Sequence, residues 1–196
     1  MFTGIVEQIG SVSDVSEHSD GRRLVLSGMG LAGLNVGASI AVNGVCLTAV
    51  KVEGESVTVD VIGETLNRTN LSEAEPGETV NLEMPMRADG RFDGHIVQGH
   101  VDGAGVVTAI THDDRGTVMT IEPPPALMTY IIEKGSITVD GVSLTVAALT
   151  EESFSIALIP HTLEVTTLGL RKPGDTVNLE NDVIAKYVER LLEARE

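Results

Sequence analysis

Two histidines five residues apart, His95 and His100, are the first candidates for chemistry in the sequence. Side chains of an extended segment alternate between its two faces, so this spacing places the two rings on opposite faces. No neighbouring Cys or acidic cluster completes a zinc site around them. The pattern therefore predicts no metal centre, and leaves His100 either as a half-exposed rim residue or as a functional group.

A second candidate is Cys46, in the segment Gly44-Val45-Cys46-Leu47-Thr48, which recurs as Gly141-Val142-Ser143-Leu144-Thr145. A free cysteine is most often a small buried hydrophobe, and a nucleophilic one needs an activating His or cation, which is not adjacent here. Both copies also keep a pair of hydroxyl residues, Ser39 with Thr48 and Ser136 with Thr145. Most such hydroxyls face solvent or cap turns, so their retention indicates a shared local geometry.

Two further segments, 62–66 and 159–163, mark places where a strand stops and a helix starts. Gly63 and Pro160 interrupt strand pairing, and we expect Thr65 and Thr162 to be the helix N-caps. The functional interpretation is that free backbone groups there contact the edge of a planar heterocycle. Other polar candidates, which by default lie in solvated loops, are Lys134, Asp140 and Asp182.

These motifs recur because the chain is duplicated. Residues 39–50 match residues 136–147 at seven of twelve positions, and residues 64–83 match residues 161–180 at eleven of twenty, both at an offset of 97. Upstream, residues 4–12 align with residues 99–107 at an offset of 95. Three blocks in register indicate two copies of one domain.

The sequence pattern predicts the same series of strands in each copy. In the first copy we expect them at 4–15, 24–27, 39–42, 45–50, 56–62 and 79–84. Asn43-Gly44 and Asp140-Gly141 are dipeptides typical of tight hairpins, and short helices are expected at 65–71 and 162–168. Six short strands per copy suggest an antiparallel barrel, although the pattern alone does not separate a barrel from a sandwich. We expect domains at 1–95 and 96–182, followed by a helix in 183–196.

That helix has no counterpart in the first copy. Its apolar residues recur on one face, with charged residues opposite: Val183, Ile184, Tyr187, Val188, Leu191 and Leu192. Such a stripe needs a surface to pack on. Docking on its own barrel and self-association through a helical bundle are about equally compatible with the pattern.

Charge and composition exclude several classes of function. The chain has 13 Lys and Arg against 29 Asp and Glu, a formal net charge of −16, which disfavours nucleic acid, anionic membranes and phosphorylated ligands. Motifs for nucleotide phosphates, serine hydrolases, paired-cysteine zinc sites and haem are absent from the sequence. The single Cys46 and the lack of an 18-residue apolar run predict a soluble cytoplasmic protein.

Four motifs together resemble the riboflavin synthase family of duplicated lumazine-binding domains: residues 1–7, 43–48, 94–103 and 140–145. The resemblance covers essentially the whole chain. It implies an all-β fold of two six-stranded antiparallel (Greek-key) barrels and a homotrimer held by the C-terminal helices. Its active site would lie between barrel 1 of one chain and barrel 2 of a neighbour. The implied reaction is a dismutation of two 6,7-dimethyl-8-ribityllumazine molecules, in which a four-carbon unit passes between them.

The products would be riboflavin and 5-amino-6-(D-ribitylamino)uracil, and the resemblance implies no cofactor and no metal. It also implies association with lumazine synthase. The chain departs from the family pattern at Val45, where many members have a second Cys, and at Asp93, where they have Gly.

The resemblance also implies the site residues. One lumazine site would comprise Gly4, Ile5, Val6, Cys46, Leu47, Thr48, Asp60, Val61, Ile62, Gly63, Glu64 and Thr65. The other would comprise Gly99, His100, Val101, Ser143, Leu144, Thr145, Leu158, Ile159, Pro160, His161, Thr162 and Leu163, with Lys134 reaching in from a neighbour. The residues around the chemistry would be Ser39, Cys46, His100, Ser143, Thr145 and Asp182, with His100 and the Cys46/Ser143 region handling proton transfer.

Two other hypotheses remain. One is a non-catalytic lumazine or flavin carrier of the same fold, like the lumazine proteins of luminous bacteria. Such carriers typically lose polar groups in one site, whereas both copies keep them here, which favours the enzyme. The other is a structural β-repeat protein, which would not explain the matched strand-to-helix breaks in both halves.

Overall fold

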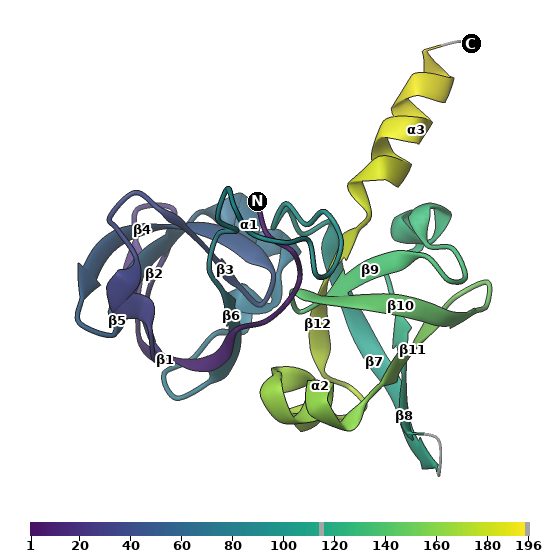
Figure 1. The fold of residues 1–196 in the computed structure, drawn as a ribbon, viewed down its shortest axis with the longest axis horizontal. Coiled ribbons are helices and arrows are strands. Elements are labelled where there is room, and N and C mark those ends of the chain that lie inside the picture. Colours follow the sequence, from purple (N-terminus) through teal and green to yellow (C-terminus); the bar gives the residue numbers. More distant parts are fainter. Residues whose placement is uncertain (114–115, 195–196) are drawn as a thin grey trace.

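The structure, a computed structural model, describes residues 1–113 and 116–194 and contains two closed barrels side by side (Figure 1). The first barrel has the strand order β1-β2-β5-β4-β3-β6, with every neighbouring pair antiparallel. Its strands are β1 (Gln8–His18), β2 (Gly21–Ser27), β3 (Ser39–Val42), β4 (Val45–Glu53), β5 (Ser56–Val61) and β6 (Thr79–Glu83). The pattern left barrel and sandwich open, and the structure decides for the barrel.

The second barrel repeats this topology in the order β10-β11-β8-β7-β12-β9. Its strands are β7 (Gly103–Asp113), β8 (Gly116–Glu122), β9 (Ser136–Val139), β10 (Val142–Leu149), β11 (Phe154–Leu158) and β12 (Thr176–Asn181). Each barrel encloses its own core of branched aliphatic side chains, because alternate residues of every strand point inward. Leu24, Ile40 and Leu82 are buried in the first core, and Ile121, Ile137 and Leu179 in the second.

The expected hairpins are confirmed. Asn43 and Gly44 have φ of 46° and 79°, and Asp140 and Gly141 have the same two values. Positive φ at both central residues is what a tight two-residue hairpin requires. The two turns face each other, since a Cβ added to Gly44 would lie 2.7 Å from the Gly141 nitrogen, and the reverse distance is the same. Only glycine allows the two barrels to approach this closely.

Short helical segments connect the strands. The structure contains η1 (Leu31–Gly33), α1 (Gly63–Arg68), η2 (Asn70–Glu73), η3 (Pro125–Tyr130), α2 (Pro160–Val165), η4 (Thr167–Leu170) and α3 (Val183–Glu193). The prediction of Thr65 and Thr162 as N-caps is wrong. The N-cap residues of α1 and α2 are Ile62 and Ile159, because the helices begin directly at Gly63 and Pro160. Neither N-cap makes a side-chain hydrogen bond.

The first strand of each barrel starts four residues later than predicted, at Gln8 and at Gly103. The strand prediction for residues 4–7, and for residues 99–102 that align with them, is therefore wrong. Gly4 and Gly99 have φ of 75° and 78°, which takes the chain out of strand geometry. An antiparallel bridge joins Phe2 to Val97, and the segments on either side of it connect the two barrels.

The barrels also contact each other through a polar network. Asn81 donates its side-chain N–H to the carbonyl of Asp140, and Asn178 donates to the carbonyl of Asn43, so the same contact occurs twice. The fully buried Asp140 carboxylate accepts two N–H bonds from Arg171, at 2.6 and 3.0 Å, and one from Asn70. In the first repeat the matching positions are Asn43 and Ala74, which carry no charge.

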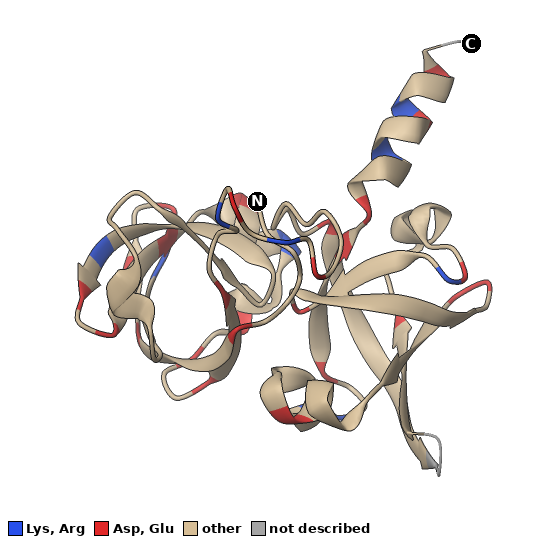
Figure 2. Ribbon diagram, viewed as in Figure 1, with Lys and Arg blue, Asp and Glu red and all other residues tan. Residues whose placement is uncertain are grey.

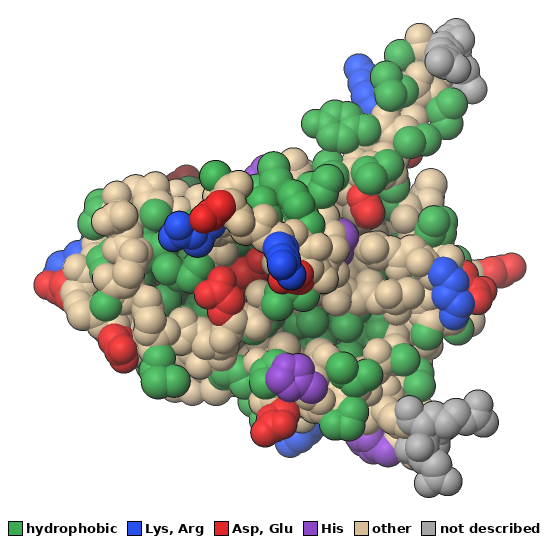
Figure 3. Space-filling model, in the orientation of Figure 1, with side chains coloured by type: hydrophobic (Ala, Val, Ile, Leu, Met, Phe, Trp, Pro, Cys, Tyr) green, Lys and Arg blue, Asp and Glu red, His purple; other side chains and the backbone are tan. Residues whose placement is uncertain are grey.

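Helix α3 projects away from both barrels (Figure 1). Its apolar residues Ile184, Tyr187, Val188, Leu191 and Leu192 are all exposed, and Figure 3 shows hydrophobic side chains along it. Polar contacts tie it to the second barrel, from Lys186 to Asp102 and from Tyr130 to Glu189. Within the described ranges, no helix combines the length and the apolar composition needed to cross a membrane.

The Asp140–Arg171 pair generates a stability prediction. Removing one partner of a buried ion pair leaves an uncompensated charge, so Arg171→Ala is expected to lower the free energy of unfolding by about 3–5 kcal/mol. The double variant Asp140→Asn, Arg171→Ala reproduces the neutral Asn43 and Ala74 of the first repeat, and it should recover most of that loss. Chemical denaturation of the three proteins measures both changes. A double variant as unstable as Arg171→Ala would contradict this account.

Candidate functional site

Two buried carboxylates hold the segments that precede β1 and β7. Glu83, at the end of β6, accepts the backbone N–H groups of Thr3 and Gly4 at 2.6 and 3.0 Å. Glu180, in β12, accepts those of Gln98, Gly99 and His100 at 2.8, 2.9 and 2.9 Å. Burial raises the pKa of both carboxyls, and the N–H donors oppose this shift. Each carboxylate thereby fixes an extended segment against its own barrel.

Each segment then crosses to the other barrel. The Ser143 N–H in β10 donates to the Gly4 carbonyl at 2.7 Å, and the Cys46 N–H in β4 donates to the Gly99 carbonyl at 2.9 Å. A Cβ on Gly4 would lie 2.7 Å from the Ser143 Cβ, and one on Gly99 would lie 2.5 Å from the Cys46 Cβ. The expectation that residues 4–6 share one site with Cys46 is therefore wrong, because the structure places them against Ser143.

The polar side chains of each site project from the outer face of one strand pair. Cys46 and Thr48 lie on the same side of β4, while Leu47 between them points into the core. Ser39 of β3 is directly opposite Thr48. In the second barrel Ser143 and Thr145 of β10 take these places, and Ser136 of β9 is opposite Thr145. The hydroxyl pairs that the sequence repeats therefore line equivalent surfaces.

The starts of α1 and α2 carry the remaining residues expected in each site. Leu66 of α1 and Val101 both pack on the core of the first barrel, while Leu163 of α2 and Val6 pack on the core of the second. Ile62 and Ile159, the N-cap residues, are 59% and 61% exposed. Each site thus combines an exposed aliphatic surface with hydroxyl and backbone groups. This combination suits a flat polar ring.

Comparison with known proteins identifies the repeated domain. The lumazine binding domain model matches twice, at residues 3–85 and 98–182. The chain belongs to the riboflavin synthase family. It is 52% identical to riboflavin synthase of Mycobacterium tuberculosis strain H37Rv, over 98% of both chains. It is 47% identical to that of Actinobacillus pleuropneumoniae, over 98% of this chain and 90% of the relative.

Solved structures share the fold as well. Crystal structures of LumP complexed with 6,7-dimethyl-8-(1'-D-ribityl) lumazine and with riboflavin align with TM-scores of 0.83 and 0.84, at 27% and 29% identity. Both alignments cover 92% of this chain and 99% of the LumP chain. The two riboflavin synthases are thus more similar in sequence to this chain than the LumP structures are.

Among the residues expected from the riboflavin synthase resemblance, four lie at the edges of the two sites. His100 and His161 are exposed, and the His100 backbone is held by Glu180. Asp182 accepts the N–H of Ile184 and thereby caps α3. Lys134 is exposed, and its ammonium donates to the Ala147 carbonyl at 3.3 Å within the same chain.

Sequence reasoning missed several residues that hold these candidate sites in place. Glu83 and Glu180 recur at the offset of 97, which is a signal that could have identified them. Arg23 donates two hydrogen bonds to the predicted site residue Asp60, at 2.7 and 3.0 Å, and this contact lowers the Asp60 pKa. It is specific to the first repeat, because the second has Val118 and Ala157 at the corresponding places.

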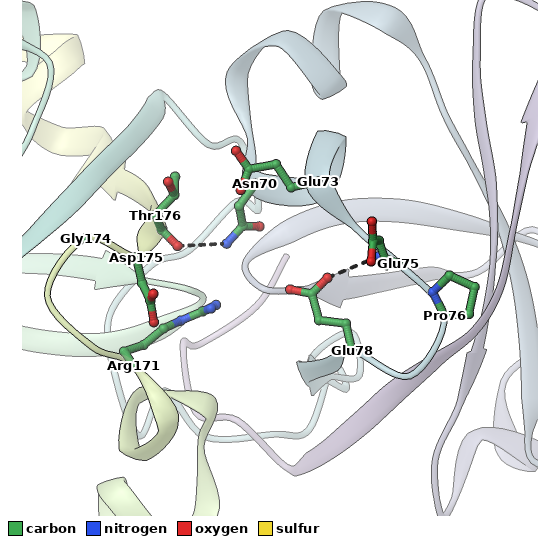
Figure 4. Close-up of a pocket in the computed structure, with 9 residues that line it drawn as sticks. All are labelled: Asn70, Glu73, Glu75, Pro76, Glu78, Arg171, Gly174, Asp175 and Thr176. Atoms are coloured by element: carbon green, nitrogen blue, oxygen red, sulfur yellow. Dashed lines mark hydrogen bonds between the residues drawn. The ribbon is translucent and has the colours of Figure 1, made fainter.

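A separate hollow of about 600 Å³ lies between η2 and the start of β12 (Figure 4). Glu73, Glu75, Glu78 and Asp175 line it, together with Arg171, whose guanidinium is engaged by Asp140. None of the expected riboflavin synthase site residues lines this hollow. Figure 2 shows that acidic residues are spread over both barrels, with only scattered Lys and Arg.

The close approach of Gly99 to Cys46 gives a prediction with a matched control. Gly77 also has a positive φ, of 97°, but a Cβ there would meet open space. Changing either residue to Ala costs about 1–2 kcal/mol of left-handed strain. Only Gly99→Ala adds the overpacking against Cys46, about 1–3 kcal/mol more. Unfolding measurements on both variants test the difference in stability. A fluorescence titration with lumazine tests binding, which we expect to be weakened in Gly99→Ala alone. Equal effects of the two variants would contradict it.

Proposed function

We propose that the chain is a riboflavin synthase that converts two molecules of 6,7-dimethyl-8-ribityllumazine into riboflavin and 5-amino-6-(D-ribitylamino)uracil. The observation that carries the proposal is the pair of composite sites, each built from a β4 or β10 hydroxyl or thiol, an exchanged segment and a helix start. Two identical ligands that react with each other need two receptors of the same shape. When the protein holds both reactants next to each other, the bimolecular reaction becomes effectively unimolecular.

The chemistry of the ligand fits the composition of the sites. Ribityllumazine carries hydroxyls and a uracil-like edge but no phosphate, so an acidic protein with few cations can bind it. The backbone N–H groups at the starts of α1 and α2, which lack a side-chain cap, can donate to ring carbonyls. The exposed Ile62 and Ile159 can cover the ring faces. The proposed substrate contacts are the residues of the two sites.

We assign the chemical steps to the outward-facing polar groups. The reaction removes a proton from the acidic 7-methyl group of one lumazine and activates the ring of the other. His100 lies beside Gly99, which contacts Cys46, so imidazole and thiol can act on the same ligand. Ser39, Ser143 and Thr145 offer hydroxyls to hold the ribityl chain or a polarised ring atom, and Asp182 supplies a carboxylate near the second site.

Assembly is part of the proposal. The exposed stripe of α3 favours self-association over docking on its own barrel, and a hollow of about 500 Å³ between η3 and α3 is lined by Ile132, Val188 and Leu192. We propose a homotrimer in which barrel 1 of one chain faces barrel 2 of the next, with Lys134 reaching into the neighbour's site. Domain boundaries at 1–95, 96–182 and 183–196, association with lumazine synthase and a cytoplasmic location belong to the same proposal.

A direct assay tests the activity. Purified protein incubated with 6,7-dimethyl-8-ribityllumazine and a chelator, without any added cofactor, is expected to form one riboflavin for every two lumazines consumed, because one molecule donates four carbons to the other. Absorbance of lumazine loss and riboflavin fluorescence give the two rates. A stable fluorescent complex without product would instead support the carrier function represented by LumP.

The role of α3 is tested by ending the chain after Asp182. The shortened protein is expected to sediment as a monomer and to bind lumazine, while turnover falls roughly a hundredfold or more because the two ligands no longer meet. Leu191→Lys should weaken assembly in the same direction, whereas Arg190→Ala on the opposite face of the helix serves as the control. Full turnover by a demonstrably monomeric truncation would rule out this role.

A further inference from the structure

The Ser143 hydroxyl has a partner that its counterpart Cys46 lacks. His95 Nδ1 lies 2.7 Å from Ser143 Oγ, within hydrogen-bonding distance, although the two residues are 48 positions apart in the chain. Among the residues that the structure describes, the Cys46 thiol makes no hydrogen bond. The two positions share a backbone contact, since each backbone N–H donates to the carbonyl of a crossing glycine.

The chain around His95 is built to bring its ring onto Ser143. A Cβ on Gly94 would lie 2.1 Å from the Thr3 carbonyl oxygen and 2.9 Å from the Ser143 Cβ, so only glycine fits there. The His95 N–H donates to the same Thr3 carbonyl at 3.2 Å. Thr3 is in turn fixed by Glu83. The ring position therefore rests on packing and on two successive backbone contacts.

The His95 ring is half-buried. This burial lowers the pKa of His95, so the imidazole is neutral over a wider range of pH than a free histidine. Asp182, at the start of α3, is the charged group that acts on the ring, and it opposes the shift. The other polar contacts of His95 are the Ser143 hydroxyl of β10 and the Thr3 carbonyl, neither of which carries charge. A neutral ring can accept a hydrogen bond through Nδ1, whereas a protonated ring can only donate hydrogen bonds.

We propose that His95 is a positioning residue, which accepts a hydrogen bond from the Ser143 hydroxyl and so aims the Ser143 oxygen lone pairs at the ligand beside residues 4–6. This inference rests on the proposed function. A serine hydroxyl has one donor and two acceptor directions. With its donor occupied by His95, Ser143 presents only acceptors to the ligand. The site at Cys46 presents an unconstrained thiol instead, so identical ligands meet different groups in the two sites.

Three variants test the proposal by steady-state kinetics. His95→Ala should lower kcat about tenfold, the loss of one ordinary hydrogen bond, while the lumazine dissociation constant changes less than about twofold. His95→Asn keeps an acceptor close to the Nδ1 position and should recover most of the turnover. If His95 acts through Ser143, then adding His95→Ala to Ser143→Ala should cause no further loss.

The pH profile separates this role from a structural one. Wild-type kcat should fall on the acid side as His95 becomes protonated, at a pH below the ordinary histidine value of about 6.5. That acid limb should be missing in His95→Asn, which has no titrating ring. His112→Asn makes the same replacement in a similar pair between β7 and β8, where His112 Nδ1 lies 2.8 Å from Thr117 Oγ1, and this control should keep the acid limb.

Each outcome decides the matter. Unchanged kcat in His95→Ala, additive losses in the double variant, or an acid limb that persists in His95→Asn would each overturn the positioning role. Thermal unfolding of every variant identifies a loss caused by misfolding, and a misfolded His95→Ala leaves the decision to His95→Asn and its pH profile. Wild-type protein that binds lumazine but forms no riboflavin would refute the proposed function, which is a separate result.

Discussion

Two backbone carbonyls, those of Gly4 and Gly99, accept the N–H groups of Ser143 and Cys46 at 2.7 and 2.9 Å. These bonds form only because each segment leaves its own barrel and pairs with the strand of the other. Glycine is required at both places, since a Cβ would overlap the facing residue. It follows that neither barrel holds a complete candidate site alone, and that ligand binding and barrel association depend on the same contacts.

The carboxylates of Glu83 and Glu180 make this exchange stable. An extended segment between two barrels has N–H groups that no strand partner satisfies, and leaving them buried and unpaired would be costly. One carboxylate satisfies two or three of them at once. Its own desolvation raises the pKa of the carboxyl, and those donors oppose this shift. A buried acid thereby serves as a fixed acceptor for the backbone beside each site.

The sequence predicted the parts of this structure that depend on local pattern. Strand positions, hairpins at Asn43-Gly44 and Asp140-Gly141, and the tail helix follow from alternation, turn residues and periodicity. The crossing of residues 4–6 to Ser143 could not be predicted, because equal repeats are compatible with both pairings. The contact of His95 with Ser143 likewise joins distant positions. The sequence alone pairs His95 only with His100, as a candidate for metal binding.

Some of the divergence between the repeats lies where the two halves meet. The polar contacts of Asn81 and Asn178 are duplicated, yet one of the facing turns carries the ion pair of Asp140 with Arg171 and the other is neutral. A charged pair present on one side only makes the two barrels unequal partners, and a second copy of the same barrel would bury either two such pairs or none. The two sites differ in the same way, because the Ser143 hydroxyl has a hydrogen-bond partner in His95 and the Cys46 thiol has no such partner among the described residues. A reaction between two identical molecules in opposite roles requires unequal surroundings, and a duplicated chain reaches them with a few substitutions on a shared framework.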